Sequence, residues 1–226
     1  MRTIIVTLLL LASIPLLACP TSLVWIPSTD IQTTNVWHLY TNTLIFTNGG
    51  STPPFVDEGI LYGVSPRIEV GADGVSPFYN IDGKVSNPLW FNGKLQLLAA
   101  SDKQPFALAV GAYGVSPQKS SNVQIFYGVG SYTFYGIRLT GGAYDGNSKV
   151  LGDDNKGYLA GIDKTIGKWW FAGDFQSGKN AFGCWNAGIG YNFTDKIQGI
   201  VGYDHYNSPA IIGAKESVNL QVGINL

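Results

Sequence analysis

Alternation of apolar and polar residues dominates the chain after residue 35, and helical spacing is hard to find. The clearest case is 217–226, where every even position is aliphatic and every odd position is polar or glycine. Successive side chains of a β-strand point to opposite faces, so such a segment has one apolar face and one polar face. Period-2 alternation therefore predicts strands throughout this part of the chain.

The same pattern defines twelve predicted strands. In 181–193, for example, Trp185 and Ile189 alternate with Asn186 and Gly190. The predicted strands are 36–46, 55–64, 67–74, 90–99, 106–115, 122–130, 135–144, 156–165, 169–176, 181–193, 196–206 and 217–226.

Connections between these strands alternate in length. Pro66 lacks a backbone N–H, which favours a tight turn after the strand that precedes it. The short connections are 65–66, 100–105, 131–134, 167–168 and 194–195, and between them come the long connections 47–54, 75–87, 145–155 and 207–216 and the medium ones 116–121 and 177–180. Short turns at one end and longer loops at the other, with an even number of strands, are typical of transmembrane β-barrels. The predicted fold is all-β, a closed antiparallel transmembrane barrel of about twelve strands.

Composition agrees with an outer wall that does not face water. Charged residues make up only 13% of the chain, whereas hydrophobic residues make up 45%. A soluble domain usually carries about 25% charged residues. A closed barrel is one of two structures that span hydrocarbon without unpaired backbone groups. The formal net charge of -1, without a basic run, argues against nucleic acid as a partner.

Aromatic residues gather near the predicted strand ends. A lipid-facing girdle at each membrane interface would place them there, whereas the core of a β-sandwich is the alternative. The residues are Trp37, Trp90, Phe91, Tyr127, Tyr135, Trp169, Phe171, Tyr191, Phe193 and Tyr203.

The N-terminus predicts export. Residues 1–18 combine Arg2, an apolar stretch and the small residue Ala18, which is the pattern of a signal peptide. Residues 19–34 would then be a periplasmic segment or a plug, and 35–226 the transmembrane barrel. Cys19 is either a lipidation site at the end of a lipobox or an ordinary residue near the cleavage point.

Two hairpin phrases carry a family resemblance. Residues 62–73, YGVSPRIEVGAD, and 191–203, YNFTDKIQGIVGY, resemble bacterial outer-membrane β-barrel proteins of the porin-like transporter group. Residues 221–226 resemble a terminal strand signal, although Leu226 stands where an aromatic residue is usual. The resemblance implies outer-membrane lipid, the barrel-assembly machinery and small solutes as partners, and location in the bacterial outer membrane after signal-peptide-directed export.

Strand alternation also assigns charged residues to the lumen. A mixed, slightly acidic interior fits either a passive channel for small solutes or a plugged structural barrel. The predicted lumen residues are Arg67, Glu69, Asp73, Lys94, Arg138, Asp163, Asp174 and Asp204.

Candidate enzyme chemistry is sparse. Twelve-stranded outer-membrane phospholipases use a His, Ser and Asn arrangement, which makes a lipid hydrolase a third hypothesis. His205 is followed by Asn207 and Ser208, but triad groups usually come from separate elements. The acidic loop 145–155 matches no calcium-loop spacing, and there is no zinc, P-loop or dinucleotide motif. We therefore predict no enzyme activity, no catalytic residue, no metal site and no cofactor.

Overall fold

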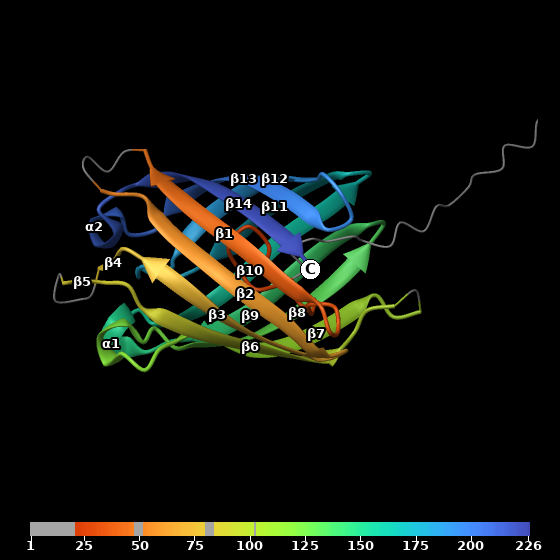
Figure 1. Cartoon of the computed structure of the whole chain (residues 1–226), viewed down its shortest axis with the longest axis horizontal. Coiled ribbons are helices and arrows are strands. Elements are labelled where there is room, and N and C mark those ends of the chain that lie inside the picture. Colours follow the sequence, from red (N-terminus) through yellow and green to blue (C-terminus); the bar gives the residue numbers. More distant parts are fainter. Residues whose placement is uncertain (1–20, 48–51, 80–83, 102) are drawn as a thin grey trace, which may run out of the picture.

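The computed structural model describes residues 21–47, 52–79, 84–101 and 103–226, and in it twelve antiparallel strands close into one barrel (Figure 1). This confirms the predicted fold class. The barrel strands are β1 (Trp37–Phe46), β2 (Phe55–Ser65), β3 (Ile68–Ser76), β6 (Leu89–Leu98), β7 (Phe106–Val115), β8 (Ile125–Phe134), β9 (Ile137–Asp145), β10 (Lys156–Ile166), β11 (Trp169–Gln176), β12 (Cys184–Asn192), β13 (Ile197–Tyr206) and β14 (Glu216–Asn225).

The first and last strands complete the barrel. β1 pairs with β2 on one side and with β14 on the other, in a register that joins His38 to Asn225 and Phe46 to Ser217. Each barrel strand thus has two hydrogen-bonded neighbours, and closure leaves no open sheet edge.

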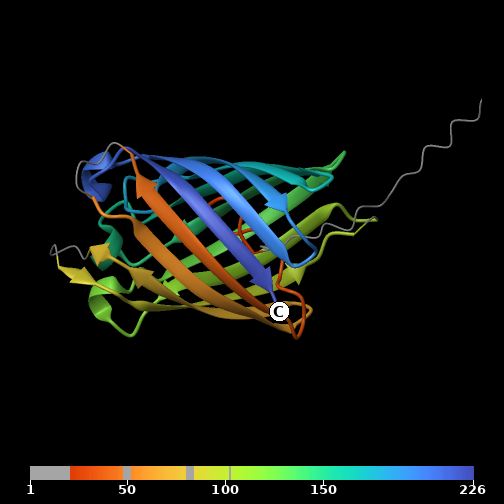
Figure 2. The same cartoon turned by 45° about the horizontal axis from the view of Figure 1, so that its top comes forward.

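The two ends of the barrel differ as the connection lengths predict. The turn end carries the short connections and the end of β14, whereas the loop end carries the small additional elements (Figures 1 and 2). These are the hairpin of β4 (Phe78–Tyr79) and β5 (Val85–Ser86), a 3₁₀ turn at Lys119–Ser121, α1 (Ser148–Leu151) and α2 (Pro209–Ile212). Among the described residues, no helix is long and apolar enough to cross a membrane.

One predicted connection is wrong. The pattern assigned 131–134 to a turn, but β8 continues to Phe134 and only Tyr135 and Gly136 separate it from β9. Both residues have positive φ, 48° and 72°. A two-residue hairpin of type I′ requires this conformation at both central positions. The polar and aromatic residues that resembled a loop therefore belong to the wall.

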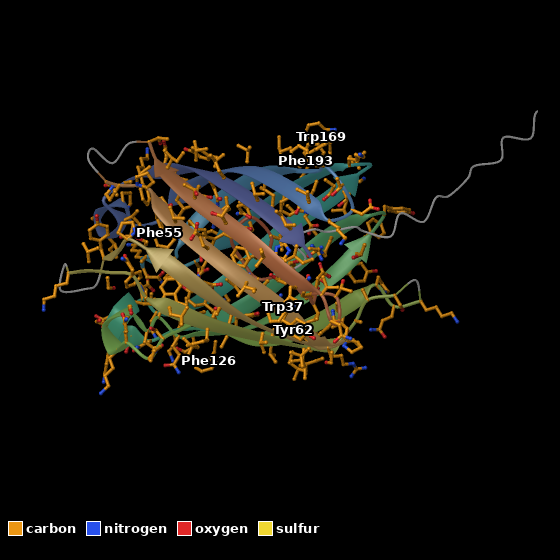
Figure 3. The ribbon with its side chains drawn as sticks, in the orientation of Figure 1. Trp37, Phe55, Tyr62, Phe126, Trp169 and Phe193 are labelled. Atoms are coloured by element: carbon orange, nitrogen blue, oxygen red, sulfur yellow. The ribbon has the colours of Figure 1, made fainter. Side chains whose placement is uncertain are left out.

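On strands such as β12 and β14 the apolar face points outward, whereas β8 has Ile125 and Val129 buried on its inner face. Ile189 and Leu220 are 50% and 40% exposed, whereas the neighbouring Asn186 and Asn219 are 7% and 0% exposed. Large aromatic side chains lie on this outer face near both ends, with Trp37, Tyr62, Trp169 and Phe193 at the turn end and Phe126 towards the loop end (Figure 3). An apolar outer wall with aromatic residues near its two rims is the surface that a lipid-facing barrel presents.

For two residues of the predicted girdle, the predicted outward orientation is wrong. Trp90 and Tyr127 are only 4% and 8% exposed and lie inside the barrel. Trp90 donates its indole N–H to the backbone oxygen of Ser121 at 2.8 Å. The ring of Tyr127 lies where a side chain at Gly111 would otherwise be. Aromatic rings suit either face of this wall, so residue type alone did not separate the two positions.

Candidate functional site inside the barrel

Residues 21–34, which we call the inner segment, lie inside the barrel (Figures 1 and 2). Leu23, Val24 and Ile26 are at most 2% exposed. The segment folds back on itself, because the amide of Leu23 donates to the Ile26 oxygen at 2.8 Å and Ser22 forms a bridge with Pro27. The tip of this hairpin lies within the lumen.

Three glycines of the wall make room for the tip, and we call them the seat glycines: Gly161 on β10, Gly188 on β12 and Gly202 on β13. A Cβ on Gly161 would lie 2.7 Å from Cδ2 of Leu23. A Cβ on Gly188 or Gly202 would lie 2.8 or 3.0 Å from a methyl group of Val24. Since real Cβ contacts are longer, only glycine at these positions allows the tip to pack this closely.

Polar side chains of the wall bind the backbone of the tip. Asp174 accepts hydrogen bonds from the amides of Trp25 and Ile26 at 2.8 and 3.4 Å. Gln221 donates to the oxygen of Val24 at 2.8 Å. Buried backbone groups outside regular secondary structure need such partners, and here the barrel wall supplies them.

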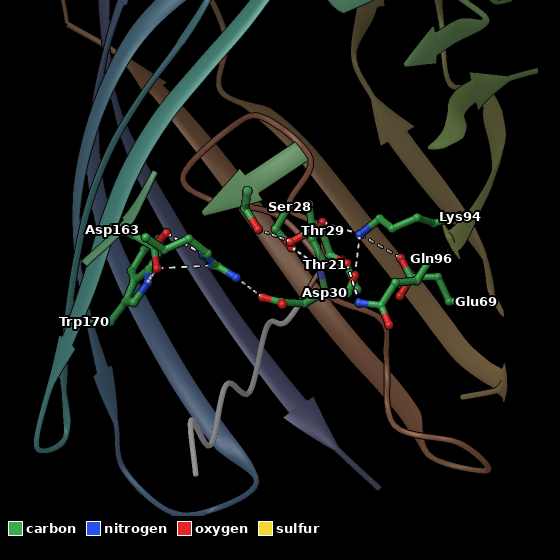
Figure 4. A network of polar contacts seen from close by, with 11 residues as sticks. Thr21, Ser28, Thr29, Asp30, Glu69, Lys94, Gln96, Asp163 and Trp170 are labelled. Atoms are coloured by element: carbon green, nitrogen blue, oxygen red, sulfur yellow. Dashed lines mark hydrogen bonds and ion pairs between the residues drawn. The ribbon is translucent and has the colours of Figure 1, made fainter. Parts of the chain in front are cut away.

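A second set of bonds lies nearer the turn end (Figure 4). Lys94 donates to the backbone oxygens of Thr21 and Asp30 at 2.7 and 2.9 Å. Its ammonium also pairs with Glu69 at 3.2 Å, and Glu69 accepts from the amide of Gln32 at 2.7 Å. Both members of this buried ion pair therefore hydrogen-bond to the inner segment.

Arg138 joins the inner segment to the opposite wall (Figure 4). Its Nε and Nη2 atoms bind the two oxygens of Asp163 at 2.8 and 3.1 Å, and Nη1 pairs with Asp30 of the inner segment. Trp170 donates its indole N–H to Asp163 at 3.2 Å. The bidentate pairing with Asp163 fixes the orientation of the Arg138 side chain and also stabilises its charge.

The structure places most of the predicted lumen residues on the inner face of the wall. Their roles in solute passage stay a prediction. These are Glu69, Asp73, Lys94, Arg138, Asp163, Asp174 and Asp204. The lumen prediction is wrong for Arg67, which lies exposed in the turn before Ile68 and not on a strand. The turn comprises residues 66–67, one residue later than predicted, so the alternation did not extend to Arg67. Cys19 and residues 1–18 lie outside the described residues.

Two cavities lie beside the inner segment. One, of about 630 Å³, opens at the turn end and is lined by Arg138, Gln96, Pro66 and Gly136. The other, of about 200 Å³, lies between the tip of the inner segment and the inner face of β1, β2, β3 and β6. We call the second one the side cavity.

The side cavity has a polar wall that sequence reasoning found only in part. Tyr40 crosses over Gly59, where a side chain would collide with its ring, and donates its hydroxyl to Asp73. Asn92 donates to the other oxygen of Asp73 from β6. Asp57 lines the same cavity. Its inward direction follows from alternation with Gly59, but the adjacent Glu58 obscured that pattern.

Aromatic rings pack together beside the tip, towards the loop end. The ring centroid of Phe182, in the connection between β11 and β12, lies 6.1 Å from that of Trp25 and 6.2 Å from that of Trp90. Tyr113 lies 6.1 Å from the same phenyl ring. These contacts link the tip of the inner segment with the β6 and β7 wall.

The two histidines and the acidic loop have local contacts. His38 is 2.8 Å from Asn225, and His205 is 3.6 Å from Glu216. Asn207 donates to the backbone oxygens of Gln176, at the end of β11, and of Gly178 in the connection that follows. Asp145 pairs with Lys156 at 2.8 Å. Across the described part of the chain, no group of three or more His, Cys, Asp or Glu residues is placed to hold a metal ion.

Solved structures with a similar fold include porins. No protein-family model matches the chain, and no curated protein matches it. A KdgM porin in complex with disordered oligogalacturonate has a TM-score of 0.62 at 10% identity, covering 83% of this chain and 97% of that chain. A NanC porin has a TM-score of 0.56 at 12% identity, covering 82% and 98%. The chain has a porin-like outer-membrane β-barrel fold.

Proposed function

We propose that this protein is a passive channel of the bacterial outer membrane for small solutes, with a mild preference for cations. The observation that carries the proposal is the pair of cavities beside the inner segment, in a closed barrel whose inner face carries charged and polar groups beside an apolar cluster. Barrels of eight strands are filled by side chains, whereas those of 16–18 strands leave a wide channel. Twelve strands with an inner segment leave a narrow passage.

Charge supports the cation preference. The inward basic groups Lys94 and Arg138 are each paired with carboxylates. Asp73, Asp174 and Asp204 are inward carboxylates that accept only neutral donors in the bonds described. A lumen with excess acidic groups attracts cations and repels anions.

The same charge separates this channel from one of the porins with a similar fold. One KdgM structure is a complex with oligogalacturonate, a chain of carboxylate-bearing sugars. An acidic lumen disfavours such a polyanion. We infer that the solutes of this channel are neutral or cationic.

A plugged structural barrel is the second candidate, and the inner segment favours it. The segment has buried apolar contacts in the seat and ion-paired anchors at Lys94 and Arg138. If these contacts block every path, the barrel is a scaffold and not a channel. Both candidates include export by residues 1–18, assembly by the barrel-assembly machinery and an outer wall in lipid.

Liposome swelling with purified, refolded protein tests the proposal. Proteoliposomes in isotonic solutions of small neutral solutes should swell faster than protein-free liposomes, and larger solutes should enter more slowly. A salt gradient across a planar bilayer should give a reversal potential of mild cation selectivity. A folded barrel that neither conducts nor admits any small solute would overturn the channel and support the plugged scaffold.

A further inference from the structure

The side cavity has one carboxylate that is held rigidly by neutral groups. The hydroxyl of Tyr40, which reaches across Gly59 from β1, and the amide of Asn92 on the neighbouring strand β6 donate to the two oxygens of Asp73. Neither donor carries a charge, so the negative charge of Asp73 is oriented but not neutralised.

Asp57 adds a second carboxylate on the same inner surface. Asp73 is opposite Gly59, two residues further along β2, so Asp57 and Asp73 are diagonal neighbours across β2 and β3. Both line the side cavity. In the described part of the chain, neither carboxylate belongs to an ion pair.

Two oxygens at this site have no donor. Asn42 on β1 is directly opposite Asp57 on β2, and both side chains line the side cavity. The Oδ1 atoms of Asn42 and Asp57 are buried, and neither has a hydrogen-bond partner among the described residues. Buried acceptors without a partner are rare in folded proteins, and their presence beside a cavity points to a missing donor.

We infer that the side cavity binds the ammonium group of a primary alkylamine. Such a group has three N–H donors, one positive charge and no acceptor. It would donate to the carboxylates of Asp57 and Asp73 beside Asn42, and it would offset the charge of the two acids. The inference deepens the proposed function, because the cavity lies on the proposed passage.

The remainder of the cavity suits an alkyl chain. Trp25, Phe55, Trp90 and Phe182 also line it, so apolar surface lies beside the acidic groups. A small ligand site commonly combines an apolar lining with a few polar groups that fix orientation. The alkyl part of the ligand therefore contacts the aromatic lining while the ammonium faces β1 to β3.

Isothermal titration calorimetry of the folded protein in detergent tests the site without relying on conductance. At low salt, n-butylammonium should give saturable one-site binding. Tetramethylammonium, which has the charge but no N–H donor, and 1-butanol, which has no charge, should each bind at least about tenfold more weakly, the scale of one charge-assisted hydrogen bond. Equal binding of tetramethylammonium would overturn the donor argument.

Substitutions locate the binding. Asp57→Asn and Asp73→Asn should each lower the affinity for n-butylammonium about tenfold or more. Glu58→Gln removes a carboxylate from the adjacent exposed position and should leave the affinity unchanged. Circular dichroism checks that each variant is folded, and where one is not, the comparison of the three ligands on the unaltered protein decides.

The outcomes are separable from those of the channel proposal. No saturable binding to a folded, conducting protein would overturn the amine site and leave the channel intact. Binding to a folded protein that does not conduct would support the site and overturn the channel. Unchanged affinity in both folded Asp→Asn variants would place the ligand elsewhere and refute the inference.

Discussion

The inner segment meets two walls of the barrel in different ways. On the β10, β12 and β13 wall, the seat glycines bring the backbone so close to Leu23 and Val24 that no side chain fits between. On the β1, β2, β3 and β6 wall, large polar side chains such as Tyr40 and Asn92 line a cavity of about 200 Å³. The first wall packs directly against the tip, whereas the second is separated from the tip by the side cavity and binds the segment through Glu69 and Lys94.

This difference shows how a barrel can contain a bound segment and still leave a passage. Burying an aliphatic side chain contributes roughly 1.5 to 3 kcal/mol, so Leu23, Val24 and Ile26 hold the tip on the seat. Carboxylates and amides on the opposite wall favour water and polar solutes. We therefore expect the seat glycines to hold the tip and the side cavity to leave space for passage beside it, while Glu69 and Lys94 attach the rest of the segment.

Deleting residues 21–33 should have the largest effect. The two cavities would merge into one wide lumen, and single-channel conductance should rise severalfold because the passage widens along its length. Planar bilayers with the full chain and the deletion variant measure this directly. Equal conductance of two folded barrels would contradict a narrowing role for the inner segment.

Filling the seat should have the next largest effect. Gly188→Leu places a side chain where Val24 lies and should displace the tip, which raises conductance towards that of the deletion variant and exposes residues 21–34 to protease. Gly141→Leu is the matched control, because Gly141 is exposed and a Cβ there has no neighbour within 4 Å. Protection from protease that survives in Gly188→Leu would show that the seat does not hold the tip.

Breaking the buried ion pair should reduce stability. Lys94→Met leaves Glu69 buried without its cation and should cost roughly 3 to 5 kcal/mol of the free energy of unfolding. Adding Glu69→Gln should restore part of that loss, because the uncompensated charge is removed. Urea unfolding in detergent, followed by tryptophan fluorescence, provides the measurement. A double variant no more stable than Lys94→Met would argue against charge burial as the cause.

A change on the wall of the side cavity should have the smallest effect. Tyr40→Phe removes the hydroxyl that donates to Asp73 and should cost about 1.5 kcal/mol, the value of one hydrogen bond to a charged group. Asn92 still donates to the same carboxylate. The same urea experiment measures it, and a loss as large as that of Lys94→Met would contradict the ranking of the buried ion pair above this single hydrogen bond.

Strand alternation predicted the wall well because the outer and inner faces of the barrel have different surroundings, which select different residue types. Asn186 and Ile189 were assigned to opposite faces from residue type, and the structure places them there. The assignment of faces failed for residues that lie outside a strand or that suit both faces. Arg67 lies in a turn, where no face exists, and Trp90 is an aromatic residue that suits either side.

The interior was less predictable than the wall. Residues 21–33 have no period, so their course inside the barrel follows from tertiary contacts such as that between Val24 and Gly188. A glycine on the polar face of a strand was the available signal, but glycine also occurs in barrels for other reasons. Asp57 was missed because Glu58 beside it made the pattern ambiguous.

Cross-linking the tip to its seat, combined with conductance, tests the central claim most directly. With Cys19 and Cys184 replaced by serine, Val24→Cys and Gly202→Cys place one sulfur near the position of a Val24 methyl group, 3.0 Å from the Cβ of its partner, which suits a disulfide. Val24→Cys with Asn42→Cys is the control pair across the side cavity. We expect that only the Val24→Cys and Gly202→Cys pair oxidises readily. The oxidised, cross-linked barrel should have the same conductance as the reduced barrel. Loss of conductance on locking, restored by reduction, would show that solutes pass only when the inner segment leaves, and would contradict a passage beside it.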